Sequence, residues 1–197
     1  MFRLNNIRFA YFGQSAIFEG FSHDFHSAEN TLIGGENGCG KSTLLRLLVG
    51  DLKCLTGEIK KETGKAFFYV PQQAESRILG LSIEQDLRLW QIAGLALSIA
   101  ELPSLPMLQG FDPQLFHLPL RELSTGTKQA YVLSLALLHT DHYLILDEAL
   151  PSLDEQRKAI FCKELSKRRG VLAVSHEDFG DNGIFNRTLI LEQGRLR

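Results

Sequence analysis

The most informative stretch of the chain is GENGCGKS, from Gly35 to Ser42, which fits the pattern Gly-x-x-x-x-Gly-Lys-Ser. A short apolar run precedes it and the helical pattern KSTLLRLLV overlaps its end, as a phosphate-binding loop requires. Backbone N–H groups can wrap a phosphate chain only where side chains do not block them, which explains the glycines. Lys41 would then reach the terminal phosphates, and the Ser42 hydroxyl would hold Mg²⁺. A glycine-rich turn that only caps a helix is the alternative.

The predicted nucleotide-binding stretch extends one residue further. Its members are Gly35, Glu36, Asn37, Gly38, Cys39, Gly40, Lys41, Ser42 and Thr43. The helix that begins near Lys41 directs its free N–H groups and the positive end of its dipole at the same anion. We interpret Cys39 as a small residue that fits the loop, and a low-pKa thiol at a helix N-terminus is the alternative.

A second set of reactive groups is the pair of carboxylates that ends YLILDE, from Tyr143 to Glu148. Four apolar residues predict a buried strand, and Asp147 at its end can bind Mg²⁺ directly or through water. Glu148, at the following bend, can orient or deprotonate a water molecule that faces the terminal phosphate. A strand that ends in a solvated acidic turn is the alternative, which the phosphate-binding loop disfavours.

The segment STGTKQ, from Ser124 to Gln129, lies directly before a long apolar helical pattern. Ser124 has the residue type of a helix N-cap, and Gly126 follows two residues later. The segment therefore predicts a second helix N-terminus that is able to bind an anion.

Short strands and helices alternate along the chain and have to position these groups. Strands are expected at 7–11, 16–18, 31–34, 66–70, 143–146, 171–175 and 188–192, and helices at 41–49, 124–139 and 154–168. This alternation predicts an α/β fold with a largely parallel sheet. Residues 72 to about 123 predict a mostly helical insert, because the pattern from 82 to about 110 is helical and leucine-rich. Pro103, Pro106 and Pro113 interrupt it.

The composition is that of an ordinary globular protein, with 44% hydrophobic and 22% charged residues in 197. A net charge of −2 gives no overall positive field for nucleic acid. No apolar run approaches the roughly 20 residues of a membrane-spanning helix, and the first residues lack the apolar core of a signal peptide. We therefore expect a cytosolic protein. Cys39, Cys54 and Cys162 form no CxxC pair and predict neither a disulfide framework nor a zinc site.

Several motifs in a fixed order give the chain a resemblance to a known family. The phosphate loop, LSTGT at 123–127, LILDE at 144–148 and Ser175-His176 are similar to the motifs of the ATPase domain of ABC transporters. YVPQQ at 69–73 resembles that family's glutamine loop, and SLD at 152–154 resembles its D-loop. The resemblance covers nearly the whole chain. It implies a P-loop NTPase fold with a mostly parallel sheet core, N-terminal antiparallel strands and a helical insert.

The resemblance also implies how the chain is organised and where it acts. It would be a single ABC ATPase domain, 1–197, with a RecA-like core at about 1–72 and 124–197 and a helical subdomain at about 73–123. The helical subdomain would dock on a transmembrane permease. The chain would then lie on the inner, cytoplasmic face of the cell membrane as a peripheral subunit, without a nucleic-acid partner.

The family's functional residues can be placed on matching positions, with ATP and Mg²⁺ as cofactors. Glu148, His176 and Gln72 would be catalytic, and Ser42, Gln72 and Asp147 would hold the metal. Tyr11 would stack on adenine. Ser124 and Gly126 of a second ABC ATPase subunit would close over the γ-phosphate, so that two ATP molecules are enclosed in a head-to-tail homo- or heterodimer. Because ADP lacks the γ-phosphate, ATP would favour the closed dimer.

Some positions depart from the family pattern. Thr125 stands where the family usually has glycine, Thr127 where it has glutamine and Ala149 where it has proline. SIEQD at 82–86 resembles the energy-coupling-factor ATPases, which serve vitamin and transition-metal uptake. The residues around Gln73 and Arg77 depart from that group. This sequence ends at Arg197, so a member of that group would be expected to continue beyond it.

Two other functions compete with a transport ATPase. A soluble ABC-type ATPase that acts on nucleic acid or ribosomes would usually carry long inserts, tandem copies or basic arms. A module that holds ATP without turnover would be expected to lack Glu148 or His176, and both are present. We interpret the basic run at 167–169 as a solvated helix end and Trp90 as a core residue, with a partner surface as the alternative.

Overall fold

The computed structural model describes residues 1–176 and 183–197, which form two compact units. The first unit comprises Met1–Tyr69, Asp141–Glu148 and Arg168–Arg197, and the second comprises Val70–Thr140 and Ala149–Lys167. The division that the family resemblance implies, at about residues 72 and 123, stays a prediction. No helix within the described residues is both long and apolar enough to pass through a bilayer.

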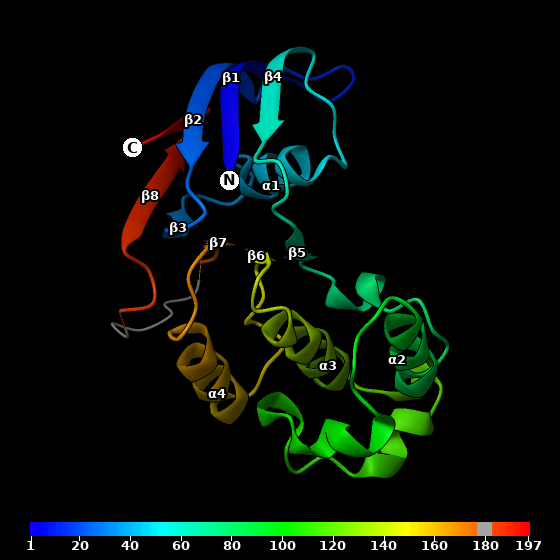
Figure 1. The fold of residues 1–197 in the computed structure, drawn as a ribbon. Coiled ribbons are helices and arrows are strands. Elements are labelled where there is room, and N and C mark those ends of the chain that lie inside the picture. The colour runs from blue at the N-terminus through cyan, green and yellow to red at the C-terminus, as the bar shows by residue number, and fades with distance from the viewer. Residues whose placement is uncertain (177–182) are drawn as a thin grey trace. The chain divides into compact units, whose positions relative to one another are not determined.

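An antiparallel sheet of three strands opens the first unit (Figure 1). Its strands, in the order β2-β1-β4, are β2 (Phe18–Phe25), β1 (Phe2–Phe9) and β4 (Thr56–Lys61). The expected strands at 7–11 and 16–18 are therefore wrong in extent. A register shift between Leu4 and Ile7, where Asn6 has a φ of 50°, interrupts the alternation of buried side chains on which a strand assignment depends. β4 was not predicted, because its sequence TGEIKK is almost entirely exposed.

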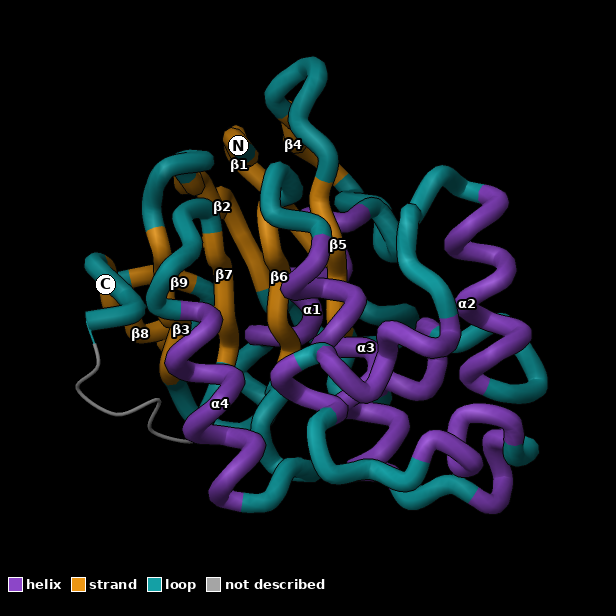
Figure 2. Tube along the Cα trace, turned by 60° about the horizontal axis from the view of Figure 1, so that its bottom comes forward, coloured by secondary structure: helices purple, strands orange, loops and turns teal. Residues whose placement is uncertain are grey.

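The second sheet of the first unit has the order β5-β6-β7-β3-β8-β9 (Figure 2). Its strands are β3 (Asn30–Gly34), β5 (Phe67–Val70), β6 (Tyr143–Asp147), β7 (Val171–Val174), β8 (Arg187–Glu192) and β9 (Arg195–Leu196). β6, β7, β3 and β8 pair in parallel, whereas β8 and β9 are antiparallel. Every residue of β6 and β7 is buried, as expected for the centre of a parallel sheet. The predicted mostly parallel fold with antiparallel N-terminal strands is confirmed.

Parallel pairing brings the candidate reactive residues to one edge of this sheet. Asp147 at the end of β6 pairs with Val174 at the end of β7, and Val174 pairs with Ile33 of β3. The segments that follow these strands carry the glycine loop, Glu148 and His176. They meet because parallel strands place their carboxyl ends side by side.

Helix α1 (Lys41–Val49) matches the predicted helix. It begins after Gly40 and ends before Gly50, whose N–H donates to the carbonyls of Arg46 and Leu47. Its leucines are buried in the same core as the phenylalanines of β1 and β2. This packing fixes the helix N-terminus directly after the glycine loop.

The second unit contains three α-helices and a series of short 3₁₀-helices. They are η1 (Ala74–Arg77), α2 (Ile83–Ile92), η2 (Ile99–Ser104), η3 (Pro106–Leu108), η4 (Pro113–His117), η5 (Leu120–Glu122), α3 (Thr125–Leu138) and α4 (Glu155–Leu165). The helical insert is confirmed, and within the leucine-rich segment from 82 to about 110 the regular helix α2 ends at Ile92. Prolines at 103, 106 and 113 lack the N–H that a longer helix needs, so only short turns form.

Asp86 organises the insert. Its side chain is 1% exposed and accepts hydrogen bonds from the backbone N–H groups of Leu79 and Gly80, at 2.6 and 3.3 Å. It also accepts from Nε1 of Trp90 at 3.1 Å and from the hydroxyl of Tyr131 at 2.8 Å. The indole N–H of the half-buried Trp90 is thus hydrogen-bonded to Asp86. Through these bonds Asp86 connects α2, α3 and the loop before α2.

Arg168 corrects the interpretation of the basic run at 167–169. Its side chain is 7% exposed and donates to the carbonyl of His142 at 2.9 Å. Its own carbonyl accepts from the side chain of Asn30. Burial lowers the pKa of this guanidinium. The run is not a uniformly solvated helix end, because α4 ends at Leu165 and the chain then turns inward toward β7.

Candidate active site

The loop between β3 and α1 is lined by backbone because two of its positions admit only glycine. Gly35 has a φ of 138°, and a Cβ there would lie 2.4 Å from the carbonyl oxygen of Leu191. Gly40 has a φ of 109°, and its Cβ would lie 2.6 Å from Cγ2 of Ile17. Between them, Glu36, Asn37 and Gly38 are exposed and Cys39 is half-buried. The loop therefore presents N–H groups at a helix N-terminus, which suits a phosphate chain.

Lys41 lies over this loop. Its side chain is mostly buried, and Nζ donates to the carbonyls of Gly35 at 2.8 Å and Glu36 at 3.0 Å. Nζ also lies 3.0 Å from Nε2 of His176. The ammonium is thus held against the glycine loop. Its predicted contact with the terminal phosphates stays a prediction.

Ser42 and Asp147 are in direct contact. The Ser42 hydroxyl donates to Oδ1 of Asp147 at 2.8 Å, and the hydroxyl of Tyr69 donates to Oδ2 at 3.3 Å. Burial is the main reason that the pKa of Asp147 is raised above its ordinary value. A hydroxyl beside a desolvated carboxylate is a set of hard oxygen donors that fits Mg²⁺, with phosphate and water as the other ligands. The described residues contain no group of three or more His, Cys, Asp or Glu arranged to hold a metal by themselves.

Replacing Asp147 with Asn should separate stability from metal binding. The raised pKa means that the folded chain loses stability as the pH rises from 3.8, the ordinary value, through the raised one. Asp147→Asn is therefore expected to raise the melting temperature of the nucleotide-free protein at pH 7 and to weaken the Mg²⁺ dependence of nucleotide binding. Scanning fluorimetry and calorimetry check this, with the exposed Asp51→Asn as control. A variant that melts below the parent at pH 7 would contradict the assigned burial cost.

Glu148 follows β6 in a strained backbone conformation. Its φ of 49° lies in the left-handed region, which residues other than glycine seldom occupy. Its N–H donates to the carbonyl of Val174 at 3.0 Å, and its Oε2 accepts from the N–H of His176 at 3.3 Å. Only 11% of the side chain is exposed. The carboxylate is therefore held at the edge of the sheet beside His176.

The imidazole of His176 lies between two groups of opposite charge. Nε2 is 3.0 Å from Nζ of Lys41 and 3.4 Å from Oε1 of Glu148. An ammonium only donates and a carboxylate only accepts, so Nε2 can accept from Lys41 or donate a proton to Glu148, but not both at once. The tautomer of His176 thus determines whether its Nε2 is hydrogen-bonded to Lys41 or to Glu148.

Tyr11 lies next to the first turn of α1. Its hydroxyl is 3.2 Å from Oγ1 of Thr43, and its ring packs edge-on against Phe9 with centroids 5.1 Å apart. The structure thus brings Tyr11 to the predicted nucleotide-binding stretch. Its role in stacking on adenine stays a prediction.

Three predicted site residues belong to the second unit. Ser124 is exposed and caps α3, where its Oγ accepts from the N–H of Thr127 at 3.0 Å, so the predicted N-cap is confirmed. A Cβ at Gly126 would lie 3.0 Å from the carbonyl oxygen of Ser152. Gln72 is exposed in the loop after β5. The parts of these residues in nucleotide binding and catalysis stay predictions.

The sequence did not indicate the contact of Tyr69 with Asp147. AFFYV at 66–70 has the composition of a core strand, and nothing in it distinguishes Tyr69 from its neighbours. The contact depends on β5 lying beside β6 in the sheet, far from it in sequence. Only a predicted strand order could have suggested it.

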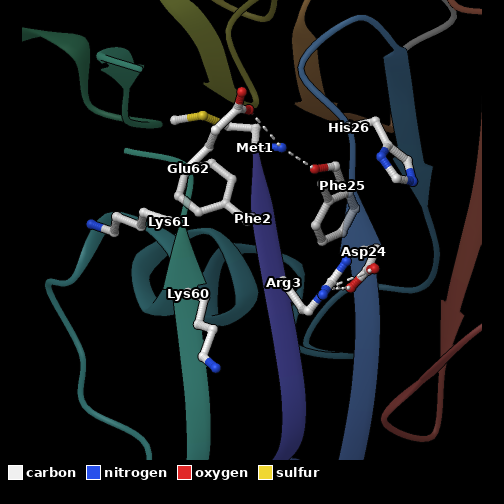
Figure 3. Close-up of a pocket in the computed structure, with 9 residues that line it drawn as sticks. All are labelled: Met1, Phe2, Arg3, Asp24, Phe25, His26, Lys60, Lys61 and Glu62. Atoms are coloured by element: carbon white, nitrogen blue, oxygen red, sulfur yellow. Dashed lines mark hydrogen bonds and ion pairs between the residues drawn. The ribbon is translucent and has the colours of Figure 1, made fainter. Parts of the chain in front are cut away.

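A separate hollow of about 260 Å³ lies at the end of the three-stranded sheet (Figure 3). Most of its charged groups have partners: Arg3 pairs with Asp24, and the amino group of Met1 donates to the carbonyl of Phe25 and pairs with Glu62. Because these charged groups already have partners within the protein, few remain to bind an ionic ligand. The site around Lys41 is therefore the better candidate for a phosphate-binding site.

Comparisons with known proteins found similar sequences. The family profile described as "ABC transporter" matches residues 18–151. The zinc import ATP-binding protein ZnuC of Ruegeria pomeroyi is 33% identical over 162 residues, which cover 77% of this chain and 59% of that relative. The cytochrome c biogenesis ATP-binding export protein CcmA of Brucella abortus is 31% identical over 190 residues, covering 89% of this chain and 86% of the relative.

Solved structures share the fold. The dimeric, post-hydrolysis ATP-binding cassette MJ0796, bound to ADP and Pi, superimposes with a TM-score of 0.81 at 20% identity, covering all of this chain and 97% of that one. CbiO1 of Clostridium perfringens, part of the transporter complex cbiONQ, gives a TM-score of 0.73 at 21% identity and covers all of this chain and 86% of that one.

Proposed function

The chain belongs to the ABC transporter family as one of its ATPase cassettes, and we propose that it binds and hydrolyses Mg-ATP to power a membrane permease. One observation carries the proposal. Lys41, the Ser42–Asp147 pair, Glu148 and His176 converge at one edge of the parallel sheet. His176 is within hydrogen-bonding distance of both Lys41 and Glu148, and the Ser42 hydroxyl donates to Asp147.

Each group has a part in the proposed hydrolysis. The loop amides and Lys41 hold the phosphates, and Ser42 and Asp147 hold the Mg²⁺ that offsets phosphate charge. Glu148 accepts a proton from the attacking water. The backbone N–H of His176 donates to the carboxylate of Glu148, and the imidazole of His176 lies beside Lys41. Gln72 is proposed as a further ligand of the metal and a catalytic residue.

A second subunit completes the proposed site. The exposed Ser124 at the N-terminus of α3 offers a hydroxyl and free N–H groups to an anion outside its own chain. The neighbour MJ0796 is described as dimeric, which supports an assembly of two cassettes. We propose that Ser124 and Gly126 of one chain meet the γ-phosphate bound by the other, in a homo- or heterodimer.

Ser124→Arg tests this assembly. The arginine side chain should obstruct the cross-subunit contact, so ATP-dependent dimerisation should weaken by about tenfold or more, at roughly 1.4 kcal/mol per decade. Nucleotide binding by the monomer should be unchanged. Light scattering with the Glu148→Gln background, which holds ATP, measures the dimer, and Ser166→Arg at the exposed end of α4 is the matched control. Dimerisation equal to that of the parent would contradict the role of Ser124.

The proposed permease contact lies on the second unit. Leu79, Leu81, Leu89 and Ile92 are exposed on α2 and the loop before it. Beside them is a hollow of about 450 Å³, whose lining includes Leu81, His117 and Leu120. Exposed apolar side chains gathered on one element are typical of an interaction surface. Docking there would hold the chain peripherally on the inner face of the membrane.

The cargo can be proposed only as a class. The ZnuC relatives are named for zinc import, and the neighbour CbiO1 belongs to a transporter complex, which together with SIEQD at 82–86 favours uptake of a transition metal or vitamin. The chain spans 59% of that ZnuC relative but 86% of CcmA, which favours export as the second candidate. Co-purification from membranes, with the partner identified by mass, would decide between an import and an export permease.

A further inference from the structure

Gln129 is one of three buried polar residues on α3, with Thr127 and Ser134. It is 3% exposed, and its Nε2 donates to the carbonyl oxygen of Ala149 at 2.8 Å. Ala149 is itself 1% exposed. A buried carbonyl that loses its donor pays the full cost of its desolvation, so this single bond has a large influence on where the Ala149 carbonyl lies.

Ala149 directly follows the proposed general base. Glu148 has a φ of 49°, a strained conformation that persists only where the surrounding structure imposes it. On one side, the N–H of Glu148 is bound to the carbonyl of Val174 at 3.0 Å. On the other side, the carbonyl of Ala149, one residue beyond Glu148, accepts from Nε2 of Gln129. Hydrogen bonds therefore hold the strained turn on both sides of Glu148. The bond to Val174 is between backbone groups, whereas the bond from Gln129 comes from a side chain.

α3 contacts the same segment a second time. A Cβ at Gly126, in the first turn of α3, would lie 3.0 Å from the carbonyl oxygen of Ser152. The first turn of α3 and the side chain of Gln129 thus both contact the segment 149–152. Since Gln129 lies on α3, a displacement of this helix is expected to move the carbonyl of Ala149, one residue beyond Glu148.

We propose that Gln129 is a positioning residue, which fixes the turn that carries Glu148 and couples it to the first turn of α3. The inference rests on the proposed function, because it assigns regulation of the same site. When a second subunit contacts Ser124, a shift of α3 would move Gln129 and, through the carbonyl of Ala149, the carboxylate of Glu148.

The test replaces the amide without changing the length of the side chain. Gln129→Met should lower kcat for ATP about tenfold and leave KM and the Kd for Mg-ADP within about twofold, since the phosphate loop is untouched. Gln129→Asn, which keeps an amide but is too short to reach Ala149, should behave in the same way. Gln156→Met, at an exposed glutamine of α4, is the control and should match the parent. Turnover by Gln129→Met and Gln129→Asn equal to the parent would overturn the inference.

A double-mutant cycle asks whether Gln129 acts through Glu148. With Glu148 already changed to Gln, adding Gln129→Met should slow hydrolysis no further, because the residue it positions is no longer a base. A full further tenfold loss would overturn the inference. If Gln129→Met melts too low to assay, Gln129→Asn is used in the cycle. A parent protein without ATPase activity would contradict the proposed function itself, whereas an active parent with unaffected variants contradicts only the role of Gln129.

Discussion

Glu148→Gln is expected to slow ATP hydrolysis by a factor of about 10²–10⁴, the usual contribution of a general base. Glutamine keeps the size of the side chain and an acceptor for the N–H of His176, which lies 3.3 Å from Oε2. It cannot take a proton from water. ATP should therefore still bind, and the unhydrolysed nucleotide should hold two chains together.

Steady-state phosphate release and light scattering with ATP measure the two effects. Glu122→Gln is a matched control, because Glu122 is exposed in the second unit. If Glu148→Gln hydrolyses ATP like the parent, Glu148 is not the base, whatever its geometry. A dimer that forms equally well with ADP would contradict the role of the γ-phosphate in assembly.

Lys41→Met is expected to weaken nucleotide binding by about 30- to 4,000-fold. Truncating one partner of a buried, hydrogen-bonded charge pair costs about 2–5 kcal/mol, and Lys41 is 6% exposed. Methionine keeps most of the stem, so the loop should lose the ammonium and its bonds to Gly35 and Glu36 rather than its packing. Calorimetric titration with Mg-ATP measures the loss.

The control for this variant is Lys53→Met, at an exposed lysine of the same unit. It should bind Mg-ATP like the parent. If Lys41→Met also binds like the parent, the loop does not hold phosphate through this side chain.

The sequence predicted the elements whose signals are local. Helix 41–49 was predicted with its observed bounds because glycines mark both ends and leucines repeat at helical spacing. The buried strands β6 and β7 were recognisable as uninterrupted apolar runs. The order of motifs and the family profile agree on an ABC ATPase cassette, so that prediction is confirmed.

Two kinds of feature could not be predicted from the sequence: strands without a regular apolar pattern, and contacts between residues far apart in the chain. The irregular register around Asn6 concealed β1, and the exposed side chains of β4 gave no apolar pattern. The contacts of Tyr69 with Asp147 and of Gln129 with Ala149 join segments 78 and 20 residues apart. Nothing in the residue types announces them, because tyrosine and glutamine are common in strands and helices without such partners.

The loop around Gly40 is expected to bind the phosphates of a magnesium nucleotide. Calorimetric titration of the unchanged protein with Mg-ATP tests it most directly, with Lys41→Met as the reference. We expect saturable binding of one nucleotide per chain, which the variant should lose in large part. No heat beyond dilution at millimolar Mg-ATP would contradict it.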